Sequence, residues 1–171
     1  MVRVVGIDPG SRVTGYGVVE GNASFLRCVE FGTIPLADHR SLAQRLHDLH
    51  HALGEVLARV QPQQAAVERV FVARSADSAL KLGHARGVIL LTLDEAGLNP
   101  CEYTPAQVKK TVTGHGRAEK AQIVAMMRSI LNLDEDPPED AADALAIALC
   151  HVMMSSEEAL IAASLQDARN S

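Results

Sequence analysis

Residues 5–17 read VGIDPGSRVTGYG, and this stretch sets the expected fold. The Val-rich run Val2–Ile7 is typical of a buried strand, and it ends at the carboxylate of Asp8. Three glycines come next: Gly10, Gly15 and Gly17. Asp and Gly are ordinary turn residues, so a plain turn between two strands is one interpretation. The other interpretation makes Asp8 a functional group at a strand end, with the glycines leaving open space and turn freedom beside it.

The following residues extend this strand into a sheet. Two further β-type runs, Gly15–Glu20 and Phe25–Thr33, flank a Gly-Asn turn signal, which predicts an antiparallel three-strand meander. Leucines at helical spacing predict a helix over residues 42–60. Ala65–Val70 is then a predicted strand, parallel to the first and joined to it through that helix.

The second half of the chain is predicted to be mainly helical. The expected elements are, in chain order, a helix over 75–96, a strand over 101–103, and helices over 105–111, 118–131 and 139–154. This order predicts an α/β fold with a mixed five-stranded sheet flanked by helices. We expect a single domain over residues 1–154 and a flexible C-terminal tail over residues 155–171.

Composition narrows the class of protein. The three cysteines form neither a CxxC pair nor a metal-ligand pattern, which favours a reducing, cytoplasmic location. Neither a signal peptide nor a membrane span is recognisable, so no membrane partner is expected. Residues 69–120 hold eight basic and five acidic side chains, whereas residues 121–171 hold two and nine. This distribution suits a metal-dependent enzyme acting on phosphate, although such swings also occur on solvated surfaces.

Carboxylates stand at the predicted strand ends and on the last helix. Asp8 and Glu68 lie near the ends of parallel neighbours, where ligands of open α/β sheets gather. In the segment EDAADALAIAL, Asp140 and Asp143 share a helix face, and so do Glu139 and Asp143. Spacing alone does not choose between Glu139 and Asp140. Acids at a helix start are also explained by the helix dipole.

Four carboxylates held together would repel one another and raise each other's pKa. Mg²⁺ or Mn²⁺ would relieve this repulsion, because hard cations take oxygen ligands. Two such ions about 4 Å apart can activate water and stabilise the leaving oxygen of a phosphodiester. No Cys/His cluster supports zinc.

Four blocks of the sequence together resemble a known family. They are GIDPGSRVTGYGVV, VERVFVARSADSALKLGHARG, QVKKTVTGHGRAEKAQI and DAADALAIAL, in this order. They closely resemble the RuvC family of bacterial Holliday junction resolvases over roughly residues 2–152. The resemblance implies a ribonuclease H-like fold, in agreement with the predicted layers.

The resemblance also implies a site and an activity. The metal ligands would be Asp8, Glu68, Asp140 and Asp143, which selects Asp140 over Glu139. Members of this family are homodimers that nick two opposed strands of four-way junction DNA, using Mg²⁺ or Mn²⁺ and leaving 5′-phosphate and 3′-hydroxyl ends. They act after the RuvA–RuvB branch-migration motor. The glycines after Asp8 would then leave room for the DNA strand.

Further positions are assigned to DNA contact. Lysines matching Lys109 and Lys120 lie on the DNA-binding face in this family and are needed for cleavage, while Phe71 matches an aromatic that stacks on an unpaired base. The remaining candidates for DNA contact are Lys110, Arg117, His115, Arg69 and Arg74. The helix over 75–96 is apolar on more than one side, so it is either wholly buried or a two-fold dimer contact, which the resemblance favours.

Three alternatives remain at this point. An actin-like ATPase also opens with an acid followed by glycines, but it needs a second subdomain that 171 residues do not hold. A non-catalytic junction-binding module on the same fold is expected to lose at least one acid, and none is missing. A different ribonuclease H-like nuclease would prefer RNA–DNA hybrids or pre-tRNA-like RNA.

Overall fold

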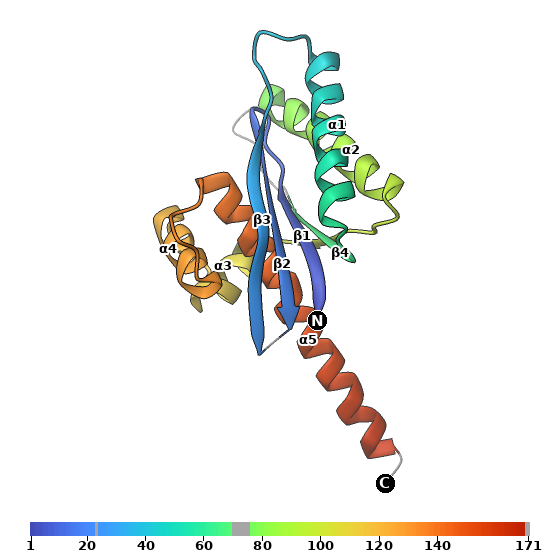
Figure 1. Ribbon diagram of the computed structural model, residues 1–171, viewed down its shortest axis with the longest axis vertical. Helices are drawn as coiled ribbons and strands as arrows, with labels where there is room; N and C mark the ends of the chain where they lie inside the picture. The colour runs from blue at the N-terminus through green and yellow to red at the C-terminus, as the bar shows by residue number, and fades with distance from the viewer. Residues whose placement is uncertain (23, 70–75, 170–171) are drawn as a thin grey trace.

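The computed structural model describes residues 1–22, 24–69 and 76–169, with side chains up to Ser156. Its described strands form one five-stranded sheet in the order β3-β2-β1-β4-β5 (Figure 1). Their bounds are β1 Val2–Asp8, β2 Val13–Asn22, β3 Phe25–Pro35, β4 Gln64–Glu68 and β5 Cys101–Tyr103. The β1–β2 and β2–β3 pairs are antiparallel, whereas β1–β4 and β4–β5 are parallel. The predicted mixed five-stranded sheet is therefore confirmed.

Helices cover both faces of this sheet (Figure 1). Their bounds are α1 Leu42–Val60, α2 Ala76–Glu95, α3 Pro105–Thr113, α4 Lys120–Leu131 and α5 Glu139–Arg169. One core cluster joins α1 and α2 to one face of the sheet, and a second joins α3, α4 and α5 to the other. The alternation of the strands supplies both cores: Val4 of β1 points to the α5 side, and Val5 points to the α1 side.

Capping residues fix where two of the helices begin. Ser41 and Thr104 each cap a helix start with a side-chain oxygen that accepts from the backbone N–H three residues later, at Gln44 and Gln107. Pro105 occupies the first turn of α3, where its missing N–H costs nothing. The start of α3 lies beside the end of β4, since Pro105 and Glu68 line the same cleft.

Helix α5 is longer than the sequence analysis predicted. The predicted end at Met154 is wrong, since the helix continues to Arg169 and extends past the sheet (Figure 1). Residues 155–169 contain good helix formers such as Ala, Leu, Glu and Gln, and no Gly or Pro to stop the helix. The flexibility of residues 155–171 and the domain limit at residue 154 stay predictions.

Three glycines on β1 and β2 let α5 lie directly on the sheet. A Cβ atom on Gly6 would lie 2.2 Å from the carbonyl oxygen of Ala144, and one on Gly15 would lie 1.9 Å from that of Asp140. A Cβ atom on Gly17 would lie 2.6 Å from the backbone nitrogen of Leu145. Gly15 and Gly17 therefore make room for α5, not for a DNA strand as the sequence analysis proposed.

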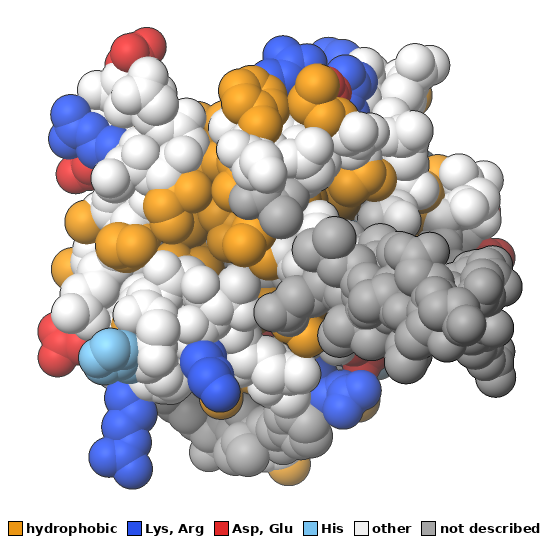
Figure 2. Space-filling model, turned by 90° about the horizontal axis from the view of Figure 1, so that it is seen from below, with side chains coloured by type: hydrophobic (Ala, Val, Ile, Leu, Met, Phe, Trp, Pro, Cys, Tyr) orange, Lys and Arg blue, Asp and Glu red, His pale blue; other side chains and the backbone are white. Residues whose placement is uncertain are grey.

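The end of the molecule where β1 begins is mainly apolar among the described residues (Figure 2). Figure 2 views this end, where apolar side chains gather and the described acidic side chains appear only scattered around the margins. Several partly buried apolar residues pack against the core on the α5 side, among them Leu26, Met126 and Ile130. Among the described residues, no helix is both long and apolar enough to span a membrane.

Candidate active site

The carboxylates gather at the opposite end of the sheet. β1 ends at Asp8 and its parallel neighbour β4 ends at Glu68, so both acids reach the same edge. The first turns of α5 bring Asp143 to this edge from the α5 face. A cleft of about 330 Å³ is lined by Asp8, Glu68, Pro105, Val108, Lys109, Lys120, Ile123 and Asp143. The structure thus brings three of the four predicted acids and two of the predicted lysines together.

Asp140 lies near the cleft but is not among the described residues that line it. Its backbone lies against Gly15, the residue that pairs with Asp8 in the β1–β2 register. Its charge contributes to raising the pKa of Asp8 and of Asp143. Glu139 instead lies outside, 67% exposed, with its Oε2 3.4 Å from Nζ of Lys120. Asp140 as the fourth acid stays a prediction, which its effect on the pKa values of Asp8 and Asp143 favours over Glu139.

Burial and mutual repulsion raise the pKa values of three acids. The pKa of Asp8 rises from its ordinary 3.8 to about 8, first through desolvation and then through the charges of Glu68, Asp143 and Asp140. Desolvation also raises the pKa of Glu68, followed by the charge of Asp143. The pKa of Asp143 is raised mainly by its own burial. These acids are thus costly to ionise together.

The two lysines in the cleft oppose this repulsion. Nζ of Lys120 lies 3.6 Å from Oδ2 of Asp143, and its charge lowers the pKa values of Asp8, Glu68 and Asp143. The charge of Lys109 lowers those of Glu68 and Asp143. Each lysine lowers the cost of holding carboxylates together and places a positive charge where a phosphate can reach it.

The chemistry of the donor set fits a hard cation. The acids offer only carboxylate oxygens, the ligands that Mg²⁺ and Mn²⁺ prefer, and a cation among them would offset the repulsion behind the raised pKa of Asp8. Among the described side chains, no group of three or more His, Cys, Asp or Glu already has the arrangement to hold a metal ion. The acids therefore lie near one another, but their carboxylate oxygens are not arranged as a complete set of metal ligands.

The remaining candidates for DNA contact lie outside this cleft. Lys110, His115 and Arg117 are exposed on α3 and on the turn that follows it. His115 is not among the described residues that line the cleft. Arg69 follows β4, with its Nε 3.2 Å from Oε2 of Glu102. Phe71 and Arg74 lie outside the described residues.

Sequence analysis missed a residue that contacts this site. Arg86 of α2 donates a hydrogen bond from Nη1 to the backbone carbonyl oxygen of Glu68, at 2.9 Å. Because the acceptor belongs to the backbone, no spacing or residue pattern indicates this contact. Among the histidines, His151 is buried and its ring nitrogens form hydrogen bonds with Tyr103 and Gln64, so its role is in packing.

A larger hollow lies away from the carboxylates. It measures about 740 Å³ and runs between α1 and α2. Its two glutamates each lie near a histidine, with His50 3.6 Å from Glu95 and His51 3.7 Å from Glu55. The described residues that line it include no lysine and no acid at a strand end. The smaller cleft is therefore the better candidate for chemistry on phosphate.

A mixed sheet of this order, with acids at the ends of β1 and β4 and on α5, defines a ribonuclease H-like nuclease. Comparison with known proteins narrows this class. The family model described as "Crossover junction endodeoxyribonuclease RuvC" matches residues 4–151. The chain therefore belongs to the RuvC family of crossover junction endodeoxyribonucleases, which confirms the resemblance and excludes the actin-like ATPase alternative.

Individual relatives support this assignment over most of their length. The RuvC of Magnetococcus marinus is 53% identical over 151 residues, covering 88% of this chain and 84% of the relative. That of Alkalilimnicola ehrlichii is 51% identical, covering 93% and 96%. The structure of T. thermophilus RuvC in complex with a Holliday junction substrate has a TM-score of 0.87 at 38% identity, covering 92% of this chain and 97% of that one.

Proposed function

We propose that this chain resolves four-way DNA junctions through metal-dependent hydrolysis at the cleft lined by Asp8, Glu68 and Asp143. The observation that carries the proposal is the convergence of these carboxylates with Lys109 and Lys120, where the pKa of Asp8 rises to about 8. The solved complex of T. thermophilus RuvC with a Holliday junction substrate supports the choice of DNA substrate.

The four acids would hold the metal ions. RuvC nucleases are metal-dependent, and we propose two ions per subunit, Mg²⁺ or Mn²⁺, held by Asp8, Glu68, Asp140 and Asp143. Ions bound there would supply an activated water and charge stabilisation for hydrolysis that leaves 5′-phosphate and 3′-hydroxyl ends. The protein's own contribution is to keep these side chains desolvated and close together, with Asp8 fixed by the β1–β2 and β1–β4 pairing.

The lysines of the cleft would position the scissile phosphate. Lys109 on α3 and Lys120 on α4 line the same cleft as the acids. When a phosphate enters, Nζ of Lys120 can move from Asp143, at 3.6 Å, to a phosphate oxygen. This exchange would leave Asp143 free to act as a ligand while the lysine binds the substrate.

The exposed basic residues beside the cleft would bind the junction arms. Lys110, His115 and Arg117 continue the basic surface of Lys109 and Lys120 along α3 and the α3–α4 turn. Contacts of this type go to the DNA backbone and give affinity without reading sequence. Arg69, together with Arg74 and Phe71, is proposed to contact the centre of the junction, where Phe71 would stack on an unpaired base.

Two copies of the chain would act together. Leu80 and Leu91 of α2 are 61% and 53% exposed, so this helix presents large apolar side chains that a second copy of the chain would cover. A two-fold dimer through α2 would cover them and would place two clefts for paired, symmetric nicks. Action in the cytoplasm after the RuvA–RuvB motor is part of the same proposal and rests on the family assignment.

The test is cleavage of a synthetic four-way junction with a mobile core. Wild type and Asp8→Asn are compared with Mg²⁺, with Mn²⁺ and with EDTA. We expect symmetric paired nicks that ligase can seal, dependent on metal and absent in Asp8→Asn. Binding without cleavage under every metal would instead identify a non-catalytic junction-binding module. Preferential cleavage of RNA–DNA hybrid would identify a different ribonuclease H-like nuclease, and nicking that persists in Asp8→Asn would contradict the proposed site.

A further inference from the structure

The end of β4 is held by an arginine from the neighbouring helix. Nη1 of Arg86 donates to the carbonyl oxygen of Glu68 at 2.9 Å, and its Nη2 donates to Oε1 of Glu102 on β5. The Arg86 side chain is only 18% exposed. A half-enclosed guanidinium with two acceptors in fixed directions keeps its geometry better than a lysine would.

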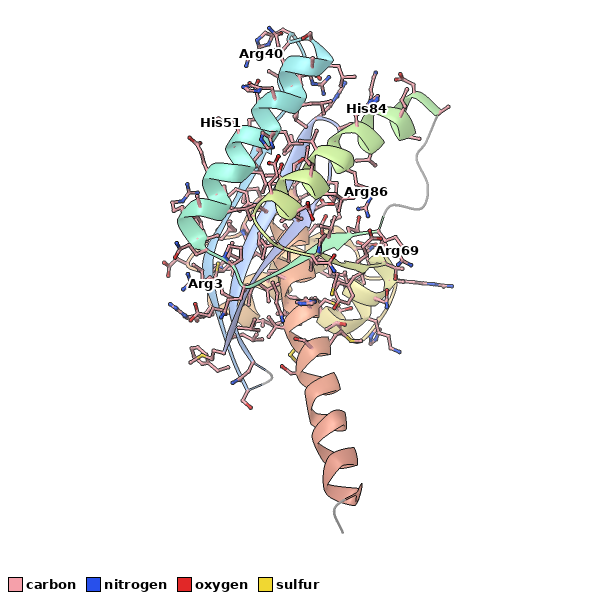
Figure 3. All side chains as sticks on the ribbon, turned by 90° about the vertical axis from the view of Figure 1, so that its right-hand side faces the viewer. Arg3, Arg40, His51, Arg69, His84 and Arg86 are labelled. Atoms are coloured by element: carbon pink, nitrogen blue, oxygen red, sulfur yellow. The ribbon has the colours of Figure 1, made fainter. Side chains whose placement is uncertain are left out.

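Glu102 extends this contact to the residue after Glu68. Its Oε2 accepts from Nε of Arg69 at 3.2 Å, while the backbone N–H of Arg69 donates to the carbonyl oxygen of Tyr103 at 2.7 Å. The peptide that carries Glu68 is therefore fixed from α2 and from β5. Figure 3 shows Arg86 and Arg69 at the same side of the molecule, beside α2 and the end of β4.

A fixed peptide matters at this position because Glu68 is the last residue of β4 and lines the cleft. A strand end without the Arg86 contact would be free to turn this carboxylate away from Asp8 and Asp143. The charges that lower the pKa of Glu68 are those of Lys109 and Lys120. Arg86 contacts the backbone carbonyl and not the carboxylate, so its effect is geometric.

We propose that Arg86 is a positioning residue for the reaction: by holding the backbone carbonyl of Glu68 it keeps the Glu68 carboxylate in the cleft, ready to bind metal. This inference rests on the proposed role of Glu68 as a metal ligand. Because Arg86 belongs to α2, the same hydrogen bond connects the cleft to the helix proposed to form the dimer. Contacts that orient a metal ligand from outside typically change metal affinity or activity about 10–100-fold when removed.

The chain offers a matched control for this arginine. Arg3 also donates from Nη1 to a backbone carbonyl, that of Val60 at 2.7 Å, and it pairs with Glu20 through Nε at 2.8 Å. Its side chain is 31% exposed. Figure 3 shows Arg3 on the opposite side of the molecule from Arg86 and Arg69. Arg3→Ala thus removes the same kind of contact without touching the cleft.

The experiment measures Mn²⁺ binding to the full chain by calorimetry, without DNA, for wild type, Arg86→Ala, Arg86→Lys and Arg3→Ala. We expect Arg86→Ala to weaken Mn²⁺ binding about 10-fold or more and to raise the Mg²⁺ concentration for half-maximal junction cleavage by a similar factor. Arg86→Lys restores one donor, so it is expected to fall between wild type and Arg86→Ala. Arg3→Ala is expected to leave both quantities at the wild-type level.

Two further measurements make every outcome decisive. Sedimentation of each variant reports the oligomeric state, and Glu68→Gln reports whether Glu68 binds metal at all. Unchanged metal binding in Arg86→Ala overturns the inference, as does a cleavage defect that appears only with loss of the dimer. If Glu68→Gln also binds Mn²⁺ normally, the proposed metal site itself is wrong. Should Arg86→Ala fail to fold, Arg86→Lys decides, since wild-type Mn²⁺ affinity in that variant overturns the inference.

Discussion

At the end of the sheet where β1 begins, Glu20 on the neighbouring strand β2 has arginine partners. At the end where β1 and β4 finish, the acids Asp8, Glu68 and Asp143 line one cleft together. Glu20 accepts from both Arg27 and Arg3, and these contacts lower its pKa. Glu30 on β3 likewise pairs with Arg59, which lowers its pKa. The pKa of Asp8 instead rises to about 8. Since the fold pairs Glu20 and Glu30 with arginines, the raised pKa of Asp8 indicates that the acids of the cleft form a site for a cationic ligand.

The largest expected effect is on the rate of cleavage, and it distinguishes the acids of the cleft from acids that are paired with arginines. Asp143→Asn is expected to reduce junction cleavage by about 10³-fold or more, because metal-ion stabilisation of a transition state supplies several kcal/mol and about 1.4 kcal/mol corresponds to tenfold in rate. Glu20→Gln is the control and is expected to leave the rate within about twofold, since Glu20 belongs to an exposed ion-pair group remote from the cleft. Single-turnover cleavage under saturating enzyme measures both. Equal losses in the two variants would contradict the comparison.

The next effect tests how the acids are brought together. Gly15→Ala would place a Cβ atom 1.9 Å from the carbonyl oxygen of Asp140, so the first turn of α5 must move. We expect a cost of about 3 kcal/mol in unfolding free energy together with loss of cleavage, as for an overpacked core. Gly54→Ala meets nothing within 4 Å and is expected to stabilise α1 by about 0.5–1 kcal/mol. Denaturant unfolding of both variants measures the difference, and a tolerated Gly15→Ala would argue against this close packing.

A pH-dependent effect on stability follows from the raised pKa of Asp8. Between its ordinary value of 3.8 and about 8, the folded metal-free protein holds a proton that the unfolded chain has lost. The stability from this proton is fully present below pH 3.8 and is lost as the pH rises through 8. Asp8→Asn removes that loss, so at high pH in EDTA the variant should be more stable than wild type by several kcal/mol, since one pKa unit corresponds to about 1.4 kcal/mol.

Thermal unfolding in EDTA across this range checks the sign. The difference between Asp8→Asn and wild type should be small near pH 4 and should grow toward pH 8.5. Added Mg²⁺ should stabilise wild type more than the variant, because ligands that bind only the folded state raise its stability. A difference that does not change with pH would show that Asp8 is not under the repulsion described above.

The smallest effect distinguishes two neighbouring lysines. Lys109 lines the cleft and lowers the pKa of Glu68 and Asp143, whereas Lys110 is exposed beside it. Lys109→Ala is expected to slow cleavage about tenfold and to shift its pH dependence upward. Lys110→Ala is expected to weaken junction binding, with the salt slope reduced by about 1, while the rate for bound junction is unchanged. A pH shift in Lys110→Ala but not in Lys109→Ala would contradict these assignments.

Much of the site follows from local patterns in the sequence. A strand that ends in an acid, a parallel neighbour that does the same, and a helix starting with acids are each visible in a few consecutive residues. Parallel pairing then places Asp8 and Glu68 at one edge without further information. This is why the sheet and the positions of these acids could be predicted.

The remaining features depend on contacts between distant segments. The contact of Gly15 with α5 joins residues far apart in the chain, so the glycine pattern alone suggested open space where a helix lies. The bond from Arg86 to Glu68 ends on a backbone atom and leaves no trace in residue types. The pairing of Glu139 with Lys120 likewise depends on how α4 meets α5. The continuation of α5 past Met154 is different, because it is visible locally: neither Gly nor Pro follows Met154 to end the helix.

The central claim is that the acids at the ends of β1 and β4 have no ion-pair partner among the described residues because they bind metal ions. Calorimetric titration of wild type and Asp8→Asn with Mn²⁺ at pH 7, in two buffers of different ionisation enthalpy, tests it most directly. We predict that wild type binds Mn²⁺ with release of protons, because the pKa of Asp8 lies near 8, and that Asp8→Asn binds about 10-fold more weakly and releases fewer protons. Equal affinities with no buffer dependence would contradict the claim.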